Sequence, residues 1–339
     1  MTASTNGPMN GPVDDPVTVP VNGSAGAPHR PRVLVLRALG LGDLLAGVPA
    51  LRALRREFGR HEIVLAAPRE LEPLVRLCGA VDTLLPASAP GRAVPEEIAW
   101  RGAPPDVAVD LHGRGPESMR PLERLGPRRL LAFAAPDGPE WRAEEHERDR
   151  WCRLLSWYGV PADPRDLGLP RPAAVSPAPG AVVLHPGAGS PARCWPVERY
   201  AAVAAELRRS GRRVVVTGGP LEHDLTARLA KLAGLPDTDV LGAPPLERLA
   251  ALVADASAVV SGDTGIAHLA VAQGTPSVTL FGPVPPRLWG PPDLPRHRAL
   301  WHPGPPGNPH GRVPDPLLLR IRPKEVLAAL SRLPEVRAA

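Results

Sequence analysis

The sequence contains few cysteines and few aromatic residues. Its 339 residues include 3 cysteines, and aromatic side chains make up 4% of the chain. Cys78, Cys152 and Cys194 are far apart and form no CxxC pair. A disulfide framework is therefore not expected, and this cysteine usage is typical of a reducing, cytoplasmic setting.

Lysine is almost absent, so arginine carries the positive charge of the chain. There are 40 basic and 35 acidic residues, which gives a formal net charge of +5, and only Lys231 and Lys324 are lysines. Together with 47 prolines, this composition is typical of coding bias in a GC-rich genome. No basic block is interleaved with aromatic residues, so nucleic-acid binding is not expected.

Long apolar runs are absent as well. No stretch of about 18 consecutive apolar residues is present, so we expect no membrane-spanning helix. Residues 1–29 lack a positively charged start followed by an apolar core, and their composition predicts a disordered tail rather than a secretory signal. The remaining length suits about two domains, and the 43% hydrophobic content is enough for their cores.

The first half of the chain alternates between strand and helix patterns. "RVLVLR" (32–37) is a short run of β-branched and leucine residues, and it is followed by apolar positions at helical spacing up to Phe58. Pro49 is expected to kink that helix or to delay its regular part. Further strands are expected at 62–68, 81–86, 105–113 and 128–136, and helices at 69–79 and 144–159. This order predicts an α/β domain with a parallel sheet.

A proline-rich segment then separates two such halves. Residues 161–180 are too rich in proline for a packed helix or a central strand, which indicates an interdomain linker. The predicted domains are therefore 30–160 and 181–339, the second ending in a helix at 323–333. Residues 283–316 are expected to form a long loop. Strands are expected in the second domain at 181–187, 212–219, 238–242, 257–263 and 275–283.

Four glycine-rich junctions follow predicted strands, where open α/β sheets bind ligands. They are "RALGLGD" (37–43), "HPGAGSPARCWP" (185–196), "TGGPLEHD" (217–224) and "SGDTGIAH" (261–268). A helix start of this kind can hold a phosphate through amide donors and the helix dipole, or it can simply be a capped helix. None is a Walker loop or a complete GxGxxG, so a nicotinamide-dependent dehydrogenase is not favoured.

Several side chains in these junctions have both a structural and a functional interpretation. Asp43 is either a helix cap or the group that does the chemistry. Glu222 is either a ribose ligand or an acidic residue of a first helical turn, and Arg193 can bind a diphosphate in a bidentate way. The Asp-x-Asp at 237–239 is interpreted as a solvated turn. No histidine or cysteine cluster has metal-ligand spacing, so no metal is expected.

The segments "LGLGDLLAGVPALRALRREF", "HPGAGSPARCWPVERYAAVAAEL" and "SGDTGIAHLAVAQGTPSVTLFGP", in this order, resemble glycosyltransferase family 9. That is the family of the ADP-heptose:lipopolysaccharide heptosyltransferases, and the resemblance covers residues 32–333. It implies a GT-B fold, in which two Rossmann-like domains face a cleft. It also implies that the N-terminal domain binds the acceptor and the C-terminal domain binds the sugar nucleotide.

The resemblance also implies roles for individual residues. Asp43 falls on the general base, Arg193 on a position that is usually lysine, and Glu222 on the acidic residue near the nucleoside ribose. Asp263, Thr264 and Gly265 fall on the phosphate-binding helix start, with His268 one turn inside. The remaining candidates are His185, Gly187 and Ser190 for the donor, and Arg37, Gly42 and His112 for the acceptor.

The expected activity is an inverting, metal-independent transfer of a heptose-like sugar from a nucleoside diphosphate, expected to be ADP, to a hydroxyl of a cell-envelope glycolipid or other glycoconjugate. No cofactor is expected, and the location is expected to be cytoplasmic, with peripheral attachment to the inner membrane face left open. Two alternatives remain. Another GT-B enzyme, such as a sugar-nucleotide epimerase, would release UDP from a UDP-sugar. A non-catalytic protein would bind the sugar nucleotide without turnover.

Overall fold

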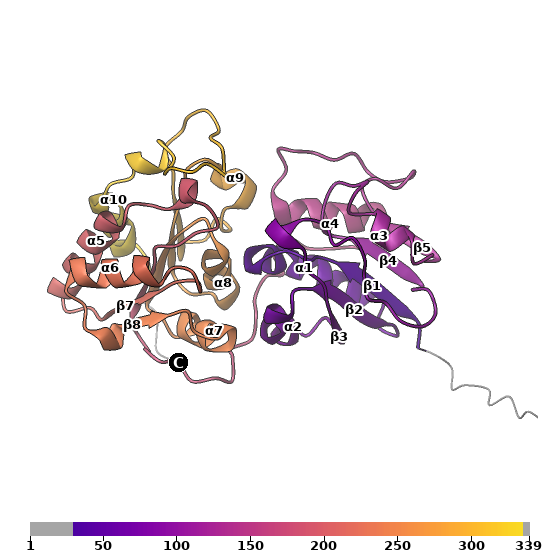
Figure 1. Cartoon of the computed structure of the whole chain (residues 1–339), viewed down its shortest axis with the longest axis horizontal. Helices are drawn as coiled ribbons and strands as arrows, with labels where there is room; N and C mark the ends of the chain where they lie inside the picture. The colour runs from indigo at the N-terminus through magenta and orange to yellow at the C-terminus, as the bar shows by residue number, and fades with distance from the viewer. Residues whose placement is uncertain (1–29, 335–339) are drawn as a thin grey trace, which may run out of the picture. The chain divides into compact units, whose positions relative to one another are not determined.

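The computed structural model describes residues 30–334. Residues 1–29, for which the sequence predicts a disordered tail, and residues 335–339 lie outside the described part. The described residues from Pro31 onward belong to one compact unit. This unit contains two sheets, which the chain builds one after the other (Figure 1).

The first sheet has five parallel strands in the order β3-β2-β1-β4-β5. The central strand β1 pairs with β2 on one side and β4 on the other, so that Val35 lies opposite Leu65 and Val109. All three side chains are fully buried, as expected for a parallel sheet covered on both faces. The strands are β1 (Arg32–Leu36), β2 (Glu62–Ala67), β3 (Thr83–Pro86), β4 (Val107–Asp110) and β5 (Arg129–Leu131).

The helices of this half include a long first helix that contains a proline. Helix α1 runs from Leu41 to Glu57 without a break, and Pro49 lies inside it. Of the two alternatives predicted for Pro49, a delay of the regular helix is therefore wrong, and a kink stays a prediction. Buried apolar side chains before and after Pro49 stabilise the helix despite the missing N–H. The other helices are α2 (Glu72–Cys78), α3 (Arg120–Glu123) and α4 (Glu147–Trp157), with 3₁₀ turns η1 (Arg69–Leu71) and η2 (Pro90–Arg92).

The second sheet has six parallel strands in the order β11-β10-β9-β6-β7-β8. They are β6 (Val182–His185), β7 (Val214–Thr217), β8 (Val240–Gly242), β9 (Ala258–Gly262), β10 (Ser277–Leu280) and β11 (His297–Leu300). The helices are α5 (Val197–Arg209), α6 (His223–Ala233), α7 (Leu246–Ala254), α8 (Gly265–Gln273), α9 (Pro286–Trp289) and α10 (Pro323–Ser331). The 3₁₀ turns are η3 (Pro191–Arg193), η4 (Asp237–Asp239) and η5 (Leu318–Arg320). Two parallel sheets confirm the expected α/β class.

The expectation of an unbroken loop over residues 283–316 is wrong. This segment contains α9 and the strand β11, which extends the sheet by pairing with β10. The strand was missed because it lies at the edge of the sheet. Of its four residues, only His297 is buried, and Arg298 and Ala299 are exposed, so β11 lacks the apolar run of a central strand.

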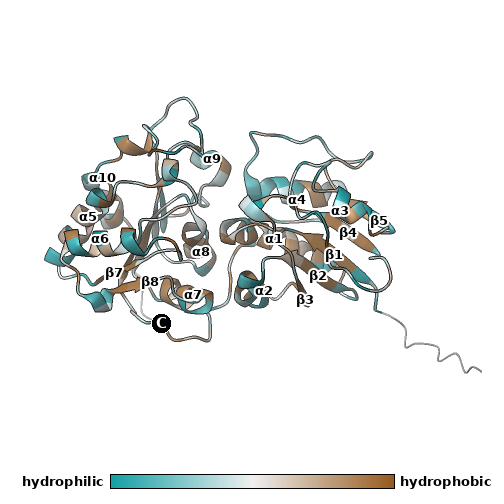
Figure 2. Ribbon diagram, in the orientation of Figure 1, coloured by the Kyte–Doolittle hydropathy of each residue, from teal (hydrophilic) through white to brown (hydrophobic). Residues whose placement is uncertain are grey.

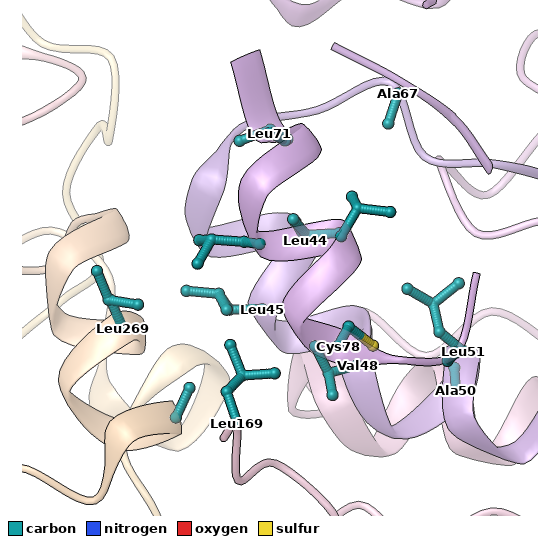
Figure 3. Packing of buried hydrophobic residues seen from close by; sticks show 14 of the residues in the cluster. Leu44, Leu45, Val48, Ala50, Leu51, Ala67, Leu71, Cys78, Leu169 and Leu269 are labelled. Carbon is teal, nitrogen blue, oxygen red and sulfur yellow. The ribbon is translucent and has the colours of Figure 1, made fainter. Parts of the chain in front are cut away.

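The hydrophobic core includes residues of both sheets. One buried cluster contains Val33 of β1 and Val183 of β6, together with Leu45 of α1 and Leu269 of α8. Figure 3 shows Leu45 and Leu269 facing one another, with Leu169 of the segment before β6 beside them. The strands are mostly hydrophobic and the outer faces of the helices are hydrophilic (Figure 2). The two helix starts that carry candidate site residues are thus on elements that share a core.

Candidate functional site

The junction after β1 brings Asp43 into the first turn of α1. One carboxylate oxygen, Oδ2, accepts a hydrogen bond from the backbone N–H of Gly40 at 3.1 Å. Within residues 30–334 the other oxygen accepts none, and 16% of the side chain is exposed. Asp43 therefore closes the start of the helix with one oxygen and leaves the second available.

Arg37, the last residue of the predicted first strand, is buried under this turn. Its Nε donates to the carbonyl oxygen of Asp43 at 2.6 Å, and its two terminal nitrogens donate to the carbonyl of Leu111 and to Oε1 of Glu147. A Cβ atom at Gly47 would lie 2.8 Å from Arg37 Nε, so glycine gives the guanidinium its space. Arg37 thus braces the backbone of Asp43 from inside the protein, and its role in binding the acceptor stays a prediction.

The end of β4 places Asp110 and His112 beside the same turn. Burial raises the pKa of Asp110 to about 6, although its carboxylate accepts bonds from Ser118 Oγ at 2.6 Å and from the His112 N–H at 2.9 Å. Burial and the charge of Arg37 lower the pKa of His112 to about 4. Because His112 Nδ1 accepts the N–H of Ala38 at 3.2 Å, the proton of the neutral ring is on Nε2.

The strand ends of β6 and β7 bring His185 and Glu222 together. Nε2 of His185 lies 3.9 Å from Oε2 of Glu222, and its Nδ1 lies 3.1 Å from the hydroxyl of Thr217. Burial lowers the pKa of His185. Glu222 accepts the N–H of Gly219 at 2.6 Å, and a Cβ atom at Gly187 would overlap its carboxylate. Glycine at position 187 is therefore what lets the Glu222 carboxylate lie against the backbone.

Arg193, of η3, and Asp263, after β9, form a partly buried ion pair. Arg193 NH1 lies 3.4 Å from Asp263 Oδ2. Nevertheless, Arg193 Nε and Asp263 Oδ2 are both buried without a hydrogen-bond partner within the described residues. Burial raises the pKa of Asp263 to about 6; the charge of Arg193 lowers it and that of Asp43 raises it. Carboxylates from both halves therefore act on one another at this place, next to an arginine.

The starts of α1 and α8 touch through glycines. A Cβ atom at Gly42 would lie 2.9 Å from Cδ2 of His268, and one at Gly265 would lie 2.8 Å from Cβ of Leu41. Thr264 is the first residue before α8, yet its side chain makes no capping hydrogen bond. The first N–H groups of α8 are therefore not closed by that side chain, and they can bind an anion.

Two further contacts involve α9, in the segment that was expected to be a loop. The ring of Trp289 packs edge-on against His268, with 5.8 Å between the ring centres. Nε2 of His146, which precedes α4, lies 3.0 Å from the carbonyl oxygen of Gly290. Removal from water and nearby positive charges, Arg148 first among them, lower the pKa of His268 to about 3, so His268 is neutral at physiological pH.

The structure thus brings most candidates to two neighbouring groups. Ser190 belongs to neither group, because its hydroxyl donates a hydrogen bond to the carbonyl oxygen of Pro309 at 2.5 Å. The first group, from both halves, consists of Gly42, Asp43, Arg193, Asp263, Thr264, Gly265 and His268. The second group, from the second half alone, consists of His185, Gly187 and Glu222.

Across residues 30–334 no group of three or more His, Cys, Asp or Glu side chains could hold a metal ion. In the Asp-x-Asp segment, Asp239 is paired with Arg213 at 3.0 Å. No helix in the same range is long and apolar enough to cross a membrane.

Solved structures share this architecture. A glycosyl transferase of family 9 from Veillonella parvula superimposes with a TM-score of 0.71 over 89% of this chain and 96% of that one, at 19% identity. ADP-heptose LPS heptosyltransferase II of E. coli does so with a TM-score of 0.70 over 88% and 97%, at 20% identity. The fold is the GT-B fold of glycosyltransferases.

Sequence comparison is more specific. The chain is 34% identical to lipopolysaccharide heptosyltransferase 2 of Salmonella typhimurium over 300 residues, which cover 75% of this chain and 84% of that protein. It is 27% identical to lipopolysaccharide heptosyltransferase 1 of the same organism over 301 residues, or 76% and 90% of the two chains. The model of glycosyltransferase family 9 (heptosyltransferase) matches residues 169–303. The chain belongs to glycosyltransferase family 9 and is a glycosyltransferase.

Proposed function

We propose that this glycosyltransferase moves a heptose-like sugar from an ADP-sugar to a hydroxyl group of a lipopolysaccharide core or related cell-envelope glycolipid, with inversion and without a metal ion. The observation that carries the proposal is the approach of Asp43, from α1, to Asp263 and the start of α8, where Asp263 is paired with Arg193. The 34% identity to a lipopolysaccharide heptosyltransferase supports the choice of sugar and acceptor.

The donor is held by the second half. Its diphosphate lies against Arg193 and the first N–H groups of α8, where backbone donors and the helix dipole favour negative charge. Arg193 Nε has no partner within the described residues, so a phosphate oxygen satisfies a group that is otherwise buried and unpaired. Glu222, at the start of α6, accepts hydrogen bonds from the ribose hydroxyls.

The acceptor approaches from the first half. The free oxygen of Asp43 takes the proton of the acceptor hydroxyl while that hydroxyl oxygen forms a bond to the anomeric carbon. The bond from this carbon to the diphosphate oxygen breaks on the opposite face, so the configuration inverts. Neutral His112 offers its Nε2–H as a donor to the acceptor at the neighbouring strand end. General-base assistance of this kind contributes about 10²–10⁴-fold to the rate.

Negative charge develops on the leaving nucleoside diphosphate. Arg193 and the α8 amides stabilise it, which is the part that a divalent ion plays in other enzymes. The family resemblance implies lysine at position 193, and arginine there keeps the charge and adds a planar, bidentate donor. This proposal therefore includes activity without added metal.

The test is release of ADP from ADP-heptose by the purified protein, with and without a heptose-deficient lipopolysaccharide acceptor and with and without EDTA. We expect ADP release that needs the acceptor and that EDTA leaves unchanged. Activity lost in EDTA and restored by magnesium or manganese would contradict metal independence. Binding of ADP without turnover would favour the non-catalytic alternative, and release of UDP from a UDP-sugar would favour the other GT-B enzyme.

The same assay tests Asp43. In Asp43→Asn the amide oxygen still accepts the Gly40 N–H, so the melting temperature should change little. The amide cannot take a proton, and we expect kcat to fall by about two orders of magnitude or more. Near-normal turnover by the folded variant, given the right acceptor, would assign Asp43 to capping alone.

A further inference from the structure

Arg92 has an unusual backbone for an arginine. It ends the short turn η2 between β3 and β4, and its φ is +62°. It is the only non-glycine residue with positive φ in the described part of the chain. This conformation costs free energy for a residue with a Cβ atom, and such strain is concentrated at sites where a side chain has to be aimed.

The strained backbone aims the Arg92 guanidinium at the candidate site. A Cβ atom at Gly40, just before α1, would lie 2.9 Å from Cζ of Arg92. NH1 lies 3.8 Å from Oδ2 of Asp43, and NH2 lies 3.9 Å from where a Cβ atom at Gly189 would be. One side chain of the first half thus reaches from the general-base candidate to the glycine loop after β6.

The N–H groups of this guanidinium donate no hydrogen bond to other residues within 30–334. The 3.8 Å separation from Asp43 is an ion-pair distance and too long for a hydrogen bond. Within residues 30–334 Arg92 has no side-chain hydrogen bond, and 64% of the side chain is exposed. Gly189 has no side chain that could fill the space next to it. An oxyanion bound on the 187–190 loop would therefore meet up to five unused N–H groups.

We propose that Arg92 binds the diphosphate of the donor. The first half of the chain thereby contributes a side chain to a diphosphate site beside the glycine loop (187–190) of the second half. The inference rests on the proposed function, because that function places a nucleoside diphosphate against Arg193, in the turn η3 that directly follows this loop. Arg92 then binds the diphosphate together with Arg193, one from each half. A nucleoside without phosphates makes no such contact, so the effect of Arg92 is confined to phosphorylated ligands.

A purely structural role for Arg92 gives a different result. If the guanidinium acted only through its charge, as a counterion of Asp43, its removal would still weaken ADP relative to adenosine, but Arg92→Lys would restore ADP binding in full. If it only shaped the loop, its removal would weaken ADP and adenosine equally. The comparison of these two ligands, read together with Arg92→Lys, therefore isolates the phosphate contact.

The experiment compares Arg92→Gly, Arg92→Lys and the control Arg101→Gly by titration calorimetry with ADP and adenosine. Glycine suits φ +62°, so Arg92→Gly should melt at the wild-type temperature or above. Arg101 is an exposed arginine of the same β3–β4 connection. The backbone carbonyl of Arg101 accepts a hydrogen bond from the side chain of Arg32, which lies at the amino end of β1, opposite the site. Arg101→Gly therefore removes one positive charge, as Arg92→Gly does, but at a place away from the site.

We expect Arg92→Gly to weaken ADP binding by about tenfold, as for one charge-assisted group, and to leave adenosine unchanged. Arg92→Lys should recover part of the loss, and Arg101→Gly should bind both ligands like wild type. Equal ADP affinity in wild type and Arg92→Gly would overturn the proposal, as would an equal loss for both ligands. Failure of the wild-type protein itself to bind ADP would instead count against the proposed function.

Discussion

At the scale of one residue, Asp263 is an ionisable group whose charged form is destabilised by the fold. Its carboxylate is buried, its Oδ2 has no hydrogen-bond partner within residues 30–334, and Arg193 stands 3.4 Å away. Burial outweighs that attraction and raises the pKa of Asp263 to about 6. The charged form is therefore less stable in the folded protein than in water, which is a common cost of groups that serve a ligand.

This raised pKa has a definite sign for stability. Between about pH 4 and pH 6 the folded protein holds a proton on Asp263 that the unfolded chain has lost, so the free energy of unfolding falls as the pH rises through this range. Asp263→Asn removes the charge and keeps the shape. We expect the variant to melt a few °C above wild type at pH 8 and at the wild-type temperature at pH 4, measured by calorimetry.

The difference between the variant and wild type is the quantity to follow. His268, whose pKa is lowered to about 3, is neutral when folded and adds a trend of opposite sign to both curves, so it cancels. Asp224→Asn, at a fully exposed side chain, is the control and should melt like wild type at both pH values. A gain in melting temperature at pH 4 as large as at pH 8 would show that the raised pKa is not its cause.

At the scale of residues, the sequence predicts which residues of the junctions are candidates for the site, but not which contacts position them. Asp43, Arg193 and Asp263 stand beside glycines after predicted strands, and this is what makes them candidates. Nothing in the sequence tells that Arg37 is buried beneath the Asp43 turn, because that depends on Glu147, which is 110 residues further along the chain. Arg92 was missed for the same reason; the one local indication is the "PGR" turn that contains it.

At the scale of elements, the starts of α1 and α8 approach so closely that side chains at two positions are excluded. A Cβ atom at Gly265 would lie 2.8 Å from Cβ of Leu41, and neither atom can move away without its helix. Gly265→Ala should therefore push α8 from α1 and lower the free energy of unfolding by about 1–3 kcal/mol. Because the α8 amides move with it, ADP binding should also weaken.

The matched control is Gly59→Ala, at a position after α1 where the nearest atom to the new Cβ is 3.7 Å away. It should leave both the denaturation midpoint in urea and the affinity for ADP near their wild-type values. If Gly265→Ala behaves in the same way, the contact between the two helix starts is looser than its geometry indicates, and it does not support the site.

Elements were predictable where their apolar pattern is strong. The central strands β1 and β6 are apolar runs bounded by glycine or proline, and both lie where the sequence predicts strands. Strand β11 has no such run, because an edge strand is buried on one side only and its partner β10 supplies the pairing. The helix around Pro49 was predicted, but not its start at Leu41, because tertiary burial outweighs the local preference of proline.

At the scale of the whole molecule, the two sheets share one of three buried clusters, and each half also has a cluster of its own. One buried cluster contains β1 and β6 residues together with the facing side chains of α1 and α8 (Figure 3). Polar contacts add to it: His146, before α4, meets the carbonyl of Gly290, and Arg287 of α9 pairs with Glu144. Loss of either sheet would expose apolar surface of the other, so their unfolding should be coupled.

We therefore expect a single calorimetric unfolding transition, although two Rossmann-like halves stand in tandem. Its van't Hoff enthalpy should equal the calorimetric enthalpy, and ADP should move the whole transition to higher temperature, because a ligand that binds only the folded state stabilises the full cooperative unit. Independent halves would give two transitions, of which ADP would move only the one that binds it. That outcome would mean that the contact between α1 and α8 transmits little free energy.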